Sequence, residues 1–241
     1  MGIKIRGLTK KYKDVTAVSN LELDIAKGEL FALLGVNGAG KTTAIKMLSG
    51  LTMPDCGTAE VAGHSILDEL SSVKELIALS PQETAVAPNL TVLENLHLMC
   101  SAYGFSKEKR NEKCSEMLEK LSLTSVSDKK ASKLSGGYMR RLSIAMALIS
   151  QPQVLFLDEP TLGIDVISRA ELWELIESLK GKMTIILTTH YMEEAERLSN
   201  RVGIMKNGKL IAVGTSEELK ILAGTDKFEG AFVKIVKGAG I

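Results

Sequence analysis

A glycine-rich segment that ends in a lysine and a threonine carries the clearest chemical signal in the sequence. Residues 35–42 read Gly-Val-Asn-Gly-Ala-Gly-Lys-Thr and stand between the apolar run Leu30–Leu34 and a predicted helix. Glycines let successive backbone N–H groups turn inward around phosphate oxygens, and the positive end of the following helix adds a favourable field. Lys41 would reach the terminal phosphates, and the Thr42 hydroxyl would bind Mg²⁺. The segment predicts a site for nucleotide phosphates without indicating the reaction.

Two adjacent carboxylates follow a second apolar run. Residues 154–157 have the composition of a buried strand, and Asp158 and Glu159 come directly after it. An aspartate at that position can hold Mg²⁺, and a glutamate beside the same phosphates can orient or deprotonate an attacking water. Two neighbouring carboxylates next to apolar residues are costly unless a cation or a proton shares their site. Together with the glycine-rich segment, the pair predicts hydrolysis of a bound nucleotide.

A third segment offers another place for an anion. Residues 134–141 read Leu-Ser-Gly-Gly-Tyr-Met-Arg-Arg, and Ser135, Gly136 and Gly137 open a predicted helix. The N–H groups at a helix start and a serine hydroxyl can bind phosphate. Taken alone, the segment is better explained by a serine that caps the helix and by two loop glycines.

Alternating strands and helices must position these segments. Continuous apolar runs such as Leu30–Leu34 indicate strands buried on both faces of a sheet. The strand–helix–strand order predicts an α/β fold with a mostly parallel sheet. The predicted strands are 3–8, 20–25, 30–34, 57–63, 77–80, 154–157, 184–188, 201–205 and 209–213, and the predicted helices are 41–49, 136–150, 169–180 and 192–198. Over residues 91–123, apolar residues recur at helical spacing, so we expect an inserted all-helical lobe.

The composition limits the class of protein. The chain has 241 residues, 45% of them hydrophobic, and a formal net charge of +1, which argues against a dedicated nucleic-acid binder. Cys56, Cys100 and Cys114 are widely spaced and form no Cys-x-x-Cys pair, so neither a disulfide framework nor a zinc site is expected. No apolar run has the length of a transmembrane helix, and no signal peptide is evident. We therefore expect a cytosolic protein that reaches a membrane only through a partner.

Six motifs in order resemble those of the nucleotide-binding subunits of ABC transporters. They are Walker A at 35–42, the Q-loop at Gln82, the signature at 134–138, Walker B at Asp158 and Glu159, the D-loop at Asp165 and the switch histidine at His190. The resemblance covers about residues 3–220. Within the family, residues 136–141 and 189–196 are similar to single-domain ATPases of bacterial exporters for drugs, antibiotics, polysaccharides or ions.

The resemblance implies a P-loop NTPase (RecA-like) core with a mostly parallel sheet, an N-terminal antiparallel β subdomain and an inserted α-helical subdomain. It implies an ABC ATPase domain over residues 1–222, with the helical subdomain at about 88–140, and a short C-terminal tail over 223–241. Tyr138, Val36 and residues 162–165 depart from the usual family pattern, but none of these departures removes a phosphate ligand or the catalytic base.

The resemblance also implies an ATPase that uses ATP and Mg²⁺ to power export through a transmembrane permease at the cytoplasmic face of the membrane, with no nucleic-acid partner. Two such subunits, identical or different, pair head to tail, so that each ATP lies between Walker A of one and the signature of the other. Glu159 acts as the base, His190 holds Glu159 and the water in register, and Gln82 senses the water and Mg²⁺. Thr42, Gln82 and Asp158 are the implied metal ligands.

The residues expected to contact nucleotide include an aromatic platform and both phosphate-binding segments. Tyr12 stacks on the adenine, and Asp165 acts across the dimer interface rather than directly on phosphate. The full set is Tyr12, Gly35, Asn37, Gly38, Ala39, Gly40, Lys41, Thr42, Thr43, Ser135, Gly136, Gly137 and Asp165.

Two other functions compete with the transporter subunit. One is a soluble ABC ATPase that regulates a non-transport complex, although such proteins usually carry two cassette domains or long coiled-coil insertions, and this sequence shows neither. The other is a regulatory nucleotide-binding module without turnover, which Glu159 and His190 argue against.

Overall fold

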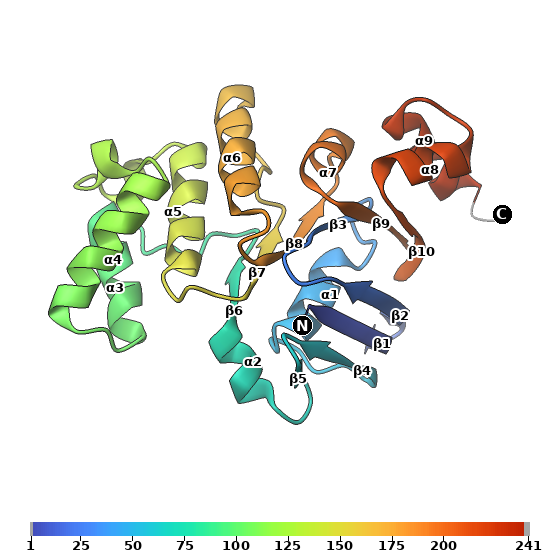
Figure 1. Cartoon of the computed structure of the whole chain (residues 1–241), viewed down its shortest axis with the longest axis horizontal. Helices are drawn as coiled ribbons and strands as arrows, with labels where there is room; N and C mark the ends of the chain where they lie inside the picture. Colours follow the sequence, from blue (N-terminus) through green and yellow to red (C-terminus); the bar gives the residue numbers. More distant parts are fainter. Residues whose placement is uncertain (1, 239–241) are drawn as a thin grey trace.

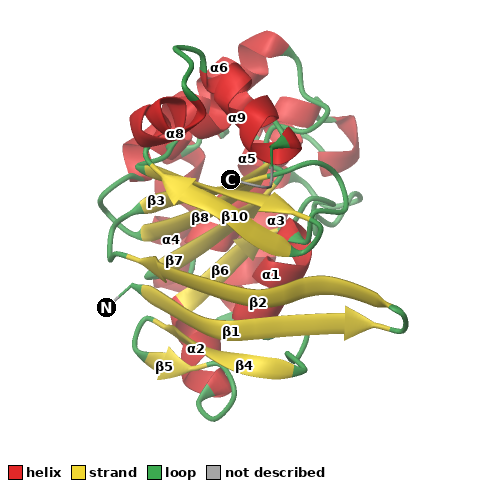
Figure 2. Cartoon of the chain, turned by 90° about the vertical axis from the view of Figure 1, so that its right-hand side faces the viewer, coloured by secondary structure: helices red, strands yellow, loops and turns green. Residues whose placement is uncertain are grey.

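An antiparallel sheet contains the N-terminal strands of this computed structural model, which describes residues 2–238. Within those residues, β1 (Ile3–Tyr12), β2 (Val15–Ile25), β4 (Cys56–Val61) and β5 (His64–Ser65) form a four-stranded sheet in the order β2-β1-β4-β5. Figure 2 shows this sheet below the larger one. One face of β1 and β2 buries apolar side chains such as Ile3, Ile5 and Leu21, so the alternation of the sequence reflects a half-buried sheet.

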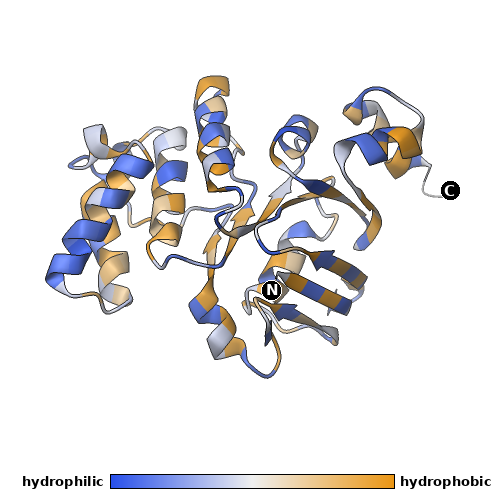
Figure 3. Cartoon of the chain, viewed as in Figure 1, coloured by the Kyte–Doolittle hydropathy of each residue, from blue (hydrophilic) through white to orange (hydrophobic). Residues whose placement is uncertain are grey.

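The larger sheet carries the strands whose ends form the site. Its order within the described residues is β10-β9-β3-β8-β7-β6, and all neighbours are parallel except β10, which runs antiparallel to β9. The bounds are β3 (Leu30–Leu34), β6 (Ile77–Ser80), β7 (Val154–Asp158), β8 (Thr184–Thr189), β9 (Arg201–Lys206) and β10 (Lys209–Gly214). Every residue of β3, β7 and β8 is buried, and the centre of the sheet is coloured hydrophobic in Figure 3.

Helices pack around the large sheet and extend the molecule at both ends (Figure 1). They are α1 (Lys41–Leu48), α2 (Leu70–Leu76), α3 (Val92–Ala102), α4 (Lys107–Lys120), α5 (Gly136–Leu148), α6 (Val166–Leu179), α7 (Met192–Leu198), α8 (Ser216–Ala223) and α9 (Phe228–Lys237). In Figure 1, α3 and α4 lie at one end of the molecule and α8 and α9 at the other. None of the helices in the described part of the chain combines the length and apolar composition that a membrane crossing requires.

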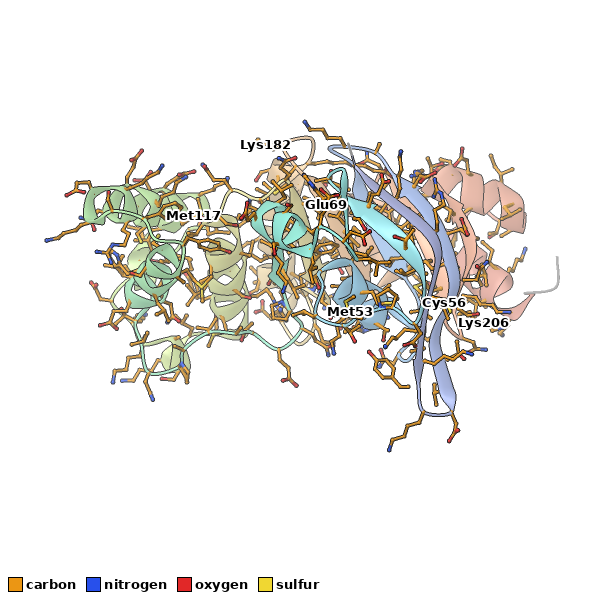
Figure 4. The ribbon with its side chains drawn as sticks, turned by 90° about the horizontal axis from the view of Figure 1, so that it is seen from below. Met53, Cys56, Glu69, Met117, Lys182 and Lys206 are labelled. Carbon is orange, nitrogen blue, oxygen red and sulfur yellow. The ribbon has the colours of Figure 1, made fainter. Side chains whose placement is uncertain are left out.

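The helices inserted between β6 and β7 pack on their own apolar side chains. Thr91 and Glu94 form a reciprocal capping box that starts α3. Cys100 of α3 faces Cys114 of α4, with their sulfur atoms 3.9 Å apart as free thiols, and Met117 is buried beside them (Figure 4). These helices therefore form a packed unit, as the helical spacing of the sequence predicted. The boundaries proposed for it, 88–140, stay a prediction.

Several elements differ from the sequence-based expectations. β2 begins at Val15, whereas the sequence predicted a start at residue 20. Its first two residues are exposed, so they show no apolar alternation from which the strand could be predicted. α6 begins at Val166 instead of residue 169, since Asp165 caps it. No structure was predicted for α9, yet its residues Phe228, Ala231, Phe232 and Ile235 are buried at helical spacing. The proposed division of the chain at residue 222 stays a prediction.

Candidate functional site

A cavity of about 630 Å³ lies at the edge of the large sheet, where β3 gives way to the glycine-rich loop. It brings the loop together with Gln82, Glu159 and His190, which follow β6, β7 and β8. The carboxyl ends of parallel strands meet at one edge of a sheet, and ligands of such sheets bind there. The lining residues are Val15, Thr16, Ala17, Asn37, Gly38, Ala39, Gly40, Lys41, Thr42, Thr43, Gln82, Glu159, Leu162, His190 and Asn207.

The glycine-rich loop leaves the start of α1 open to an anion. Gly40 has a φ of 105°, and a Cβ there would lie 2.3 Å from the carbonyl oxygen of Ala17, so only glycine fits. α1 begins without a side-chain cap and has no acidic residue in its first turn. Its first N–H groups are therefore available to phosphate oxygens, which the helix dipole favours.

A buried ion pair links the loop to the pair of carboxylates. Lys41 Nζ donates to the carbonyl oxygen of Gly35 at 2.6 Å and lies 3.2 Å from Glu159 Oε1. The other oxygen, Oε2, lies 2.7 Å from Nδ1 of His190. Only 6% of the Lys41 side chain and 7% of the Glu159 side chain are exposed, so water screens the pair weakly. Lys41 is thus shared between the glycine-rich loop and the carboxylate of Glu159.

The backbone at Glu159 is held in an uncommon conformation. Its φ is 49°, in the left-handed region that side chains other than glycine seldom adopt. Its N–H group donates to the carbonyl oxygen and to the hydroxyl of Thr188, each at 3.1 Å. These bonds stabilise a turn that points the carboxylate at the glycine-rich loop.

Asp158 and Thr42 offer adjacent oxygen atoms. The Thr42 hydroxyl donates to Asp158 Oδ1 at 3.1 Å, and the Thr188 hydroxyl donates to the same atom at 2.5 Å. Mg²⁺ binds through one or two carboxylates and completes its shell with substrate phosphates and water. In the described residues no group of three or more His, Cys, Asp or Glu side chains could hold a metal alone. Asp158 and Thr42 thus offer one carboxylate and one hydroxyl oxygen, which is a donor set that fits Mg²⁺.

The signature and the D-loop do not line this cavity. Ser135 and Gly136 are exposed, and the Ser135 hydroxyl caps α5 by accepting from Tyr138 N at 3.5 Å. Asp165 Oδ1 accepts from the N–H groups of Ile167 and Ser168 at 3.0 Å each, and these bonds lower the pKa of its carboxyl. A Cβ on Gly136 would lie 3.3 Å from Ile164, so the two segments are neighbours at the surface.

Tyr12 also lies outside the cavity lining. Its side chain is 45% exposed, and the Lys10 ammonium lies 5.6 Å from the centroid of its ring. It pairs in register with Val15, which does line the cavity, so the aromatic ring and the cavity share one hairpin. Its predicted role as the adenine platform stays a prediction.

Some residues of the site were not foreseen. Thr188 hydrogen-bonds both the Asp158 carboxylate and the backbone N–H of Glu159. The sequence signal that could have revealed this role is a hydroxyl residue near the end of the apolar strand β8, which pairs with β7. Asn207 lines the cavity because Gly208 N donates to the carbonyl oxygen of Ala39 at 3.0 Å, which ties the β9–β10 turn to the glycine-rich loop. The Asn-Gly pair predicted the turn, but nothing in the sequence indicated that the turn contacts the glycine-rich loop.

Comparisons with known proteins agree with this arrangement. The ABC transporter family model matches residues 18–162. Daunorubicin resistance ATP-binding protein DrrA3 of Streptomyces coeruleorubidus is 40% identical over 228 residues, 94% of this chain and 72% of that protein. The phospholipid-transporting ATPase ABCA3 of Homo sapiens is 42% identical over 223 residues, 91% of this chain but 13% of that protein.

A solved structure shows the same fold. A dimeric ATP-binding cassette in a post-hydrolysis state, bound to ADP and Pi, gives a TM-score of 0.80 at 27% identity over 88% of this chain and 98% of that one. The predicted P-loop NTPase fold, with a mostly parallel sheet, an antiparallel sheet and added helices, is confirmed. The chain therefore belongs to the ABC transporter family and is one of its ATP-binding, ATP-hydrolysing subunits.

Proposed function

We propose that this ATPase pairs head to tail with a second ATP-binding subunit and powers export through a membrane permease, at the cytoplasmic face of the membrane. The observation that carries the proposal is the division of the phosphate-binding elements. The cavity holds the glycine-rich loop and Glu159, whereas Ser135 and Gly136 lie exposed outside it. A second subunit that presents its own Ser135 to the first cavity would complete the site.

The surface next to Ser135 has the character of a protein interface. Val166 is 76% exposed and Ile167 is 72% exposed at the start of α6, next to Asp165. Exposed apolar side chains that lie together mark surfaces that a partner covers. The related cassette that was solved with ADP and Pi is a dimer, which supports the same arrangement here.

The proposed reaction follows from the contacts of Glu159. An arriving γ-phosphate takes Lys41 from Glu159, and the freed carboxylate orients water for in-line attack. His190, which contacts the same carboxylate, keeps it in register, and Lys41 balances the charge that develops on the phosphate. Thr42, Asp158 and Gln82 would hold Mg²⁺, which supplies further charge neutralisation. Tyr12 would stack on the adenine from the β1–β2 hairpin.

A second, apolar groove supports docking of the permease. A cavity of about 230 Å³ lies between β6, α3 and α5 and is lined mostly by apolar side chains. Leu51, 63% exposed, and Tyr103, 45% exposed, form part of it. The name of the DrrA3 relative supports export of a drug-like compound, and the name of ABCA3 supports a lipid as the alternative substrate class.

The shared site is tested by mixing two inactive variants. Lys41→Ala removes the phosphate lysine and Ser135→Arg blocks the signature, so neither homodimer has an intact site. A mixed dimer has one intact site, with Lys41 from one chain and Ser135 from the other, and phosphate release should recover to a sizeable fraction of the wild-type rate. A mixture of Lys41→Ala with the double variant is the control and should stay inactive. If the first mixture also stays inactive although mixed dimers form, both halves of the site belong to one chain.

The permease is tested by isolation from membranes. The tagged chain should stay with the membrane fraction through a high-salt wash and copurify in detergent with an integral membrane protein. Complete release by salt, with full ATPase activity in the soluble fraction, would favour the soluble ABC ATPase that regulates a non-transport complex.

A further inference from the structure

A buried arginine joins the signature helix to the Q-loop. Arg140 is the fifth residue of α5 and is 5% exposed. Its Nη1 donates to the carbonyl oxygen of Pro81 at 2.7 Å, and its Nη2 donates to that of Gln82 at 2.9 Å. The two carbonyls belong to consecutive residues, so the flat guanidinium spans them as a fork.

A second contact extends this link along the same segment. The hydroxyls of Ser143 in α5 and Ser80 at the end of β6 lie 2.9 Å apart, and both side chains are buried. Residues 143 and 140 are three apart and lie on one face of the helix. Residues 80, 81 and 82 are thus tied in sequence to a single face of α5.

Burying the charged guanidinium of Arg140 costs free energy of desolvation, which hydrogen bonds must offset. Burial lowers the pKa of its guanidinium, while attraction from Asp158 and Glu194 raises it. In the described part of the chain, neither carboxylate forms an ion pair with it, so main-chain carbonyl oxygens are its partners. Two charge-assisted hydrogen bonds to consecutive carbonyl oxygens fix a geometry that an apolar side chain at this position would not.

We propose that Arg140 is a positioning residue that fixes the peptide of Gln82 to α5, so that displacement of the helix start at Ser135 moves Gln82 relative to the cavity. The direction of transmission rests on the proposed pairing of subunits, in which Ser135 meets the partner's nucleotide. The link from Arg140 to the carbonyl oxygens of Pro81 and Gln82, called the clamp below, requires only contacts within one chain. Since α5 lies between α6 and the pair α3 and α4 in Figure 1, its displacement also reaches the helices beside the apolar groove.

The test is a kinetic double-mutant cycle between Arg140→Lys and Gln82→Ala. Arg140→Lys keeps the charge but loses the fork, and kcat for ATP should fall by about tenfold or more, because charged hydrogen bonds are lost. The KM for ATP should change less than about threefold, since Lys41 and the glycine-rich loop keep their contacts. If Arg140 acts through Gln82, the double variant should be no slower than the slower single variant. Multiplicative losses would overturn the proposal.

A matched control stands one residue along the helix. Arg141 forms an ion pair with Glu171 of α6 instead of binding the Q-loop, so Arg141→Lys should leave kcat within about twofold of wild type. Equal losses in the two lysine variants would assign the effect to the helix in general. The urea midpoints of both variants show whether a loss of activity reflects unfolding.

Amide exchange in the wild-type chain serves if Arg140→Lys does not fold. Protection of residues 80–84 and of residues 135–140 should change together on addition of ATP, and independent changes would overturn the clamp. The turnover of Ser135→Ala, measured beside the cycle between Arg140→Lys and Gln82→Ala, separates the two proposals. If Ser135→Ala leaves turnover unchanged while Arg140 still couples to Gln82, the pairing of subunits fails and the clamp stands.

Discussion

Replacing Glu159 by glutamine should destabilise the nucleotide-free fold and strongly slow hydrolysis, and bound ATP should restore the stability but not the hydrolysis rate. Glu159→Gln keeps the size of the side chain and removes its charge. Without nucleotide, Lys41 then loses the carboxylate 3.2 Å from its ammonium group and keeps the Gly35 carbonyl oxygen at 2.6 Å. With ATP bound, phosphate oxygens surround Lys41, and the lost carboxylate no longer matters for stability.

The expected magnitude follows from the burial of the pair. At 3.2 Å, two unit charges attract by about 5 kcal/mol for an effective dielectric constant of about 20. Removing one partner of a buried pair typically costs about 3–5 kcal/mol, and the retained Gly35 contact reduces this to about 2–4 kcal/mol. For a chain of this size, each kcal/mol shifts Tm by about 2–4 °C, so Tm should fall by roughly 4–16 °C. The hydrolysis rate should fall by about 10²- to 10⁴-fold with loss of the base.

Thermal unfolding with and without ATP in the presence of Mg²⁺ measures both states. Saturating ATP should raise the Tm of Glu159→Gln more than that of wild type, because wild type must first break the Lys41 contact. Glu69→Gln is the control, since Glu69 (Figure 4) also contacts a histidine, His64, at 2.9 Å, but half of its side chain is exposed, so the Tm of this variant should stay close to that of wild type. Should Glu159→Gln be as stable as wild type without nucleotide, with equal gains from ATP, the Lys41 pair does not restrain the empty site.

Two further predictions concern parts of the fold behind the site. Glu194 is fully buried and accepts from Trp173 Nε1 at 3.0 Å, and burial, with repulsion from Glu159, raises the pKa of its carboxyl above the ordinary 4.5. The stability that its neutral form provides is present at low pH and lost as the pH rises, so Glu194→Gln should gain stability relative to wild type from about pH 5 upward. Urea unfolding at several pH values measures this, and parallel curves for the two proteins would contradict it. Phe228→Ala in α9 should cost about 3 kcal/mol because the side chain is 2% exposed, whereas Val233→Ala, at a 39% exposed position, should cost under about 1 kcal/mol by the same assay. Equally small losses of unfolding free energy in both variants would show that α9 does not stabilise the fold.

The central strands of the large sheet were predictable because every residue of β3, β7 and β8 is buried. Leu30–Leu34 has in the structure the bounds that its apolar run predicted, and Ile77–Ser80 has the bounds expected for that strand. Each run ends in a chemically active segment, and parallel strands bring such segments to one edge. Gln82, Glu159 and His190 consequently share one cavity, as the order of the motifs implied. The start of β2 could not be predicted in the same way, since Val15 is 65% exposed and contributes no apolar alternation.

The contacts that set the state of the site left no comparable trace in the sequence, and the reason is physical. Burial repeats along a strand or helix and produces a period, whereas a contact between side chain and main chain produces none, because every residue has a carbonyl oxygen. Arg140 is a charged residue of the kind that usually lies at the surface, yet it is buried and its partners are the carbonyl oxygens of residues 81 and 82. Lys41 likewise donates to the carbonyl oxygen of Gly35. The sequence therefore predicts which groups perform the chemistry, and only the packed chain shows which backbone atoms hold those groups.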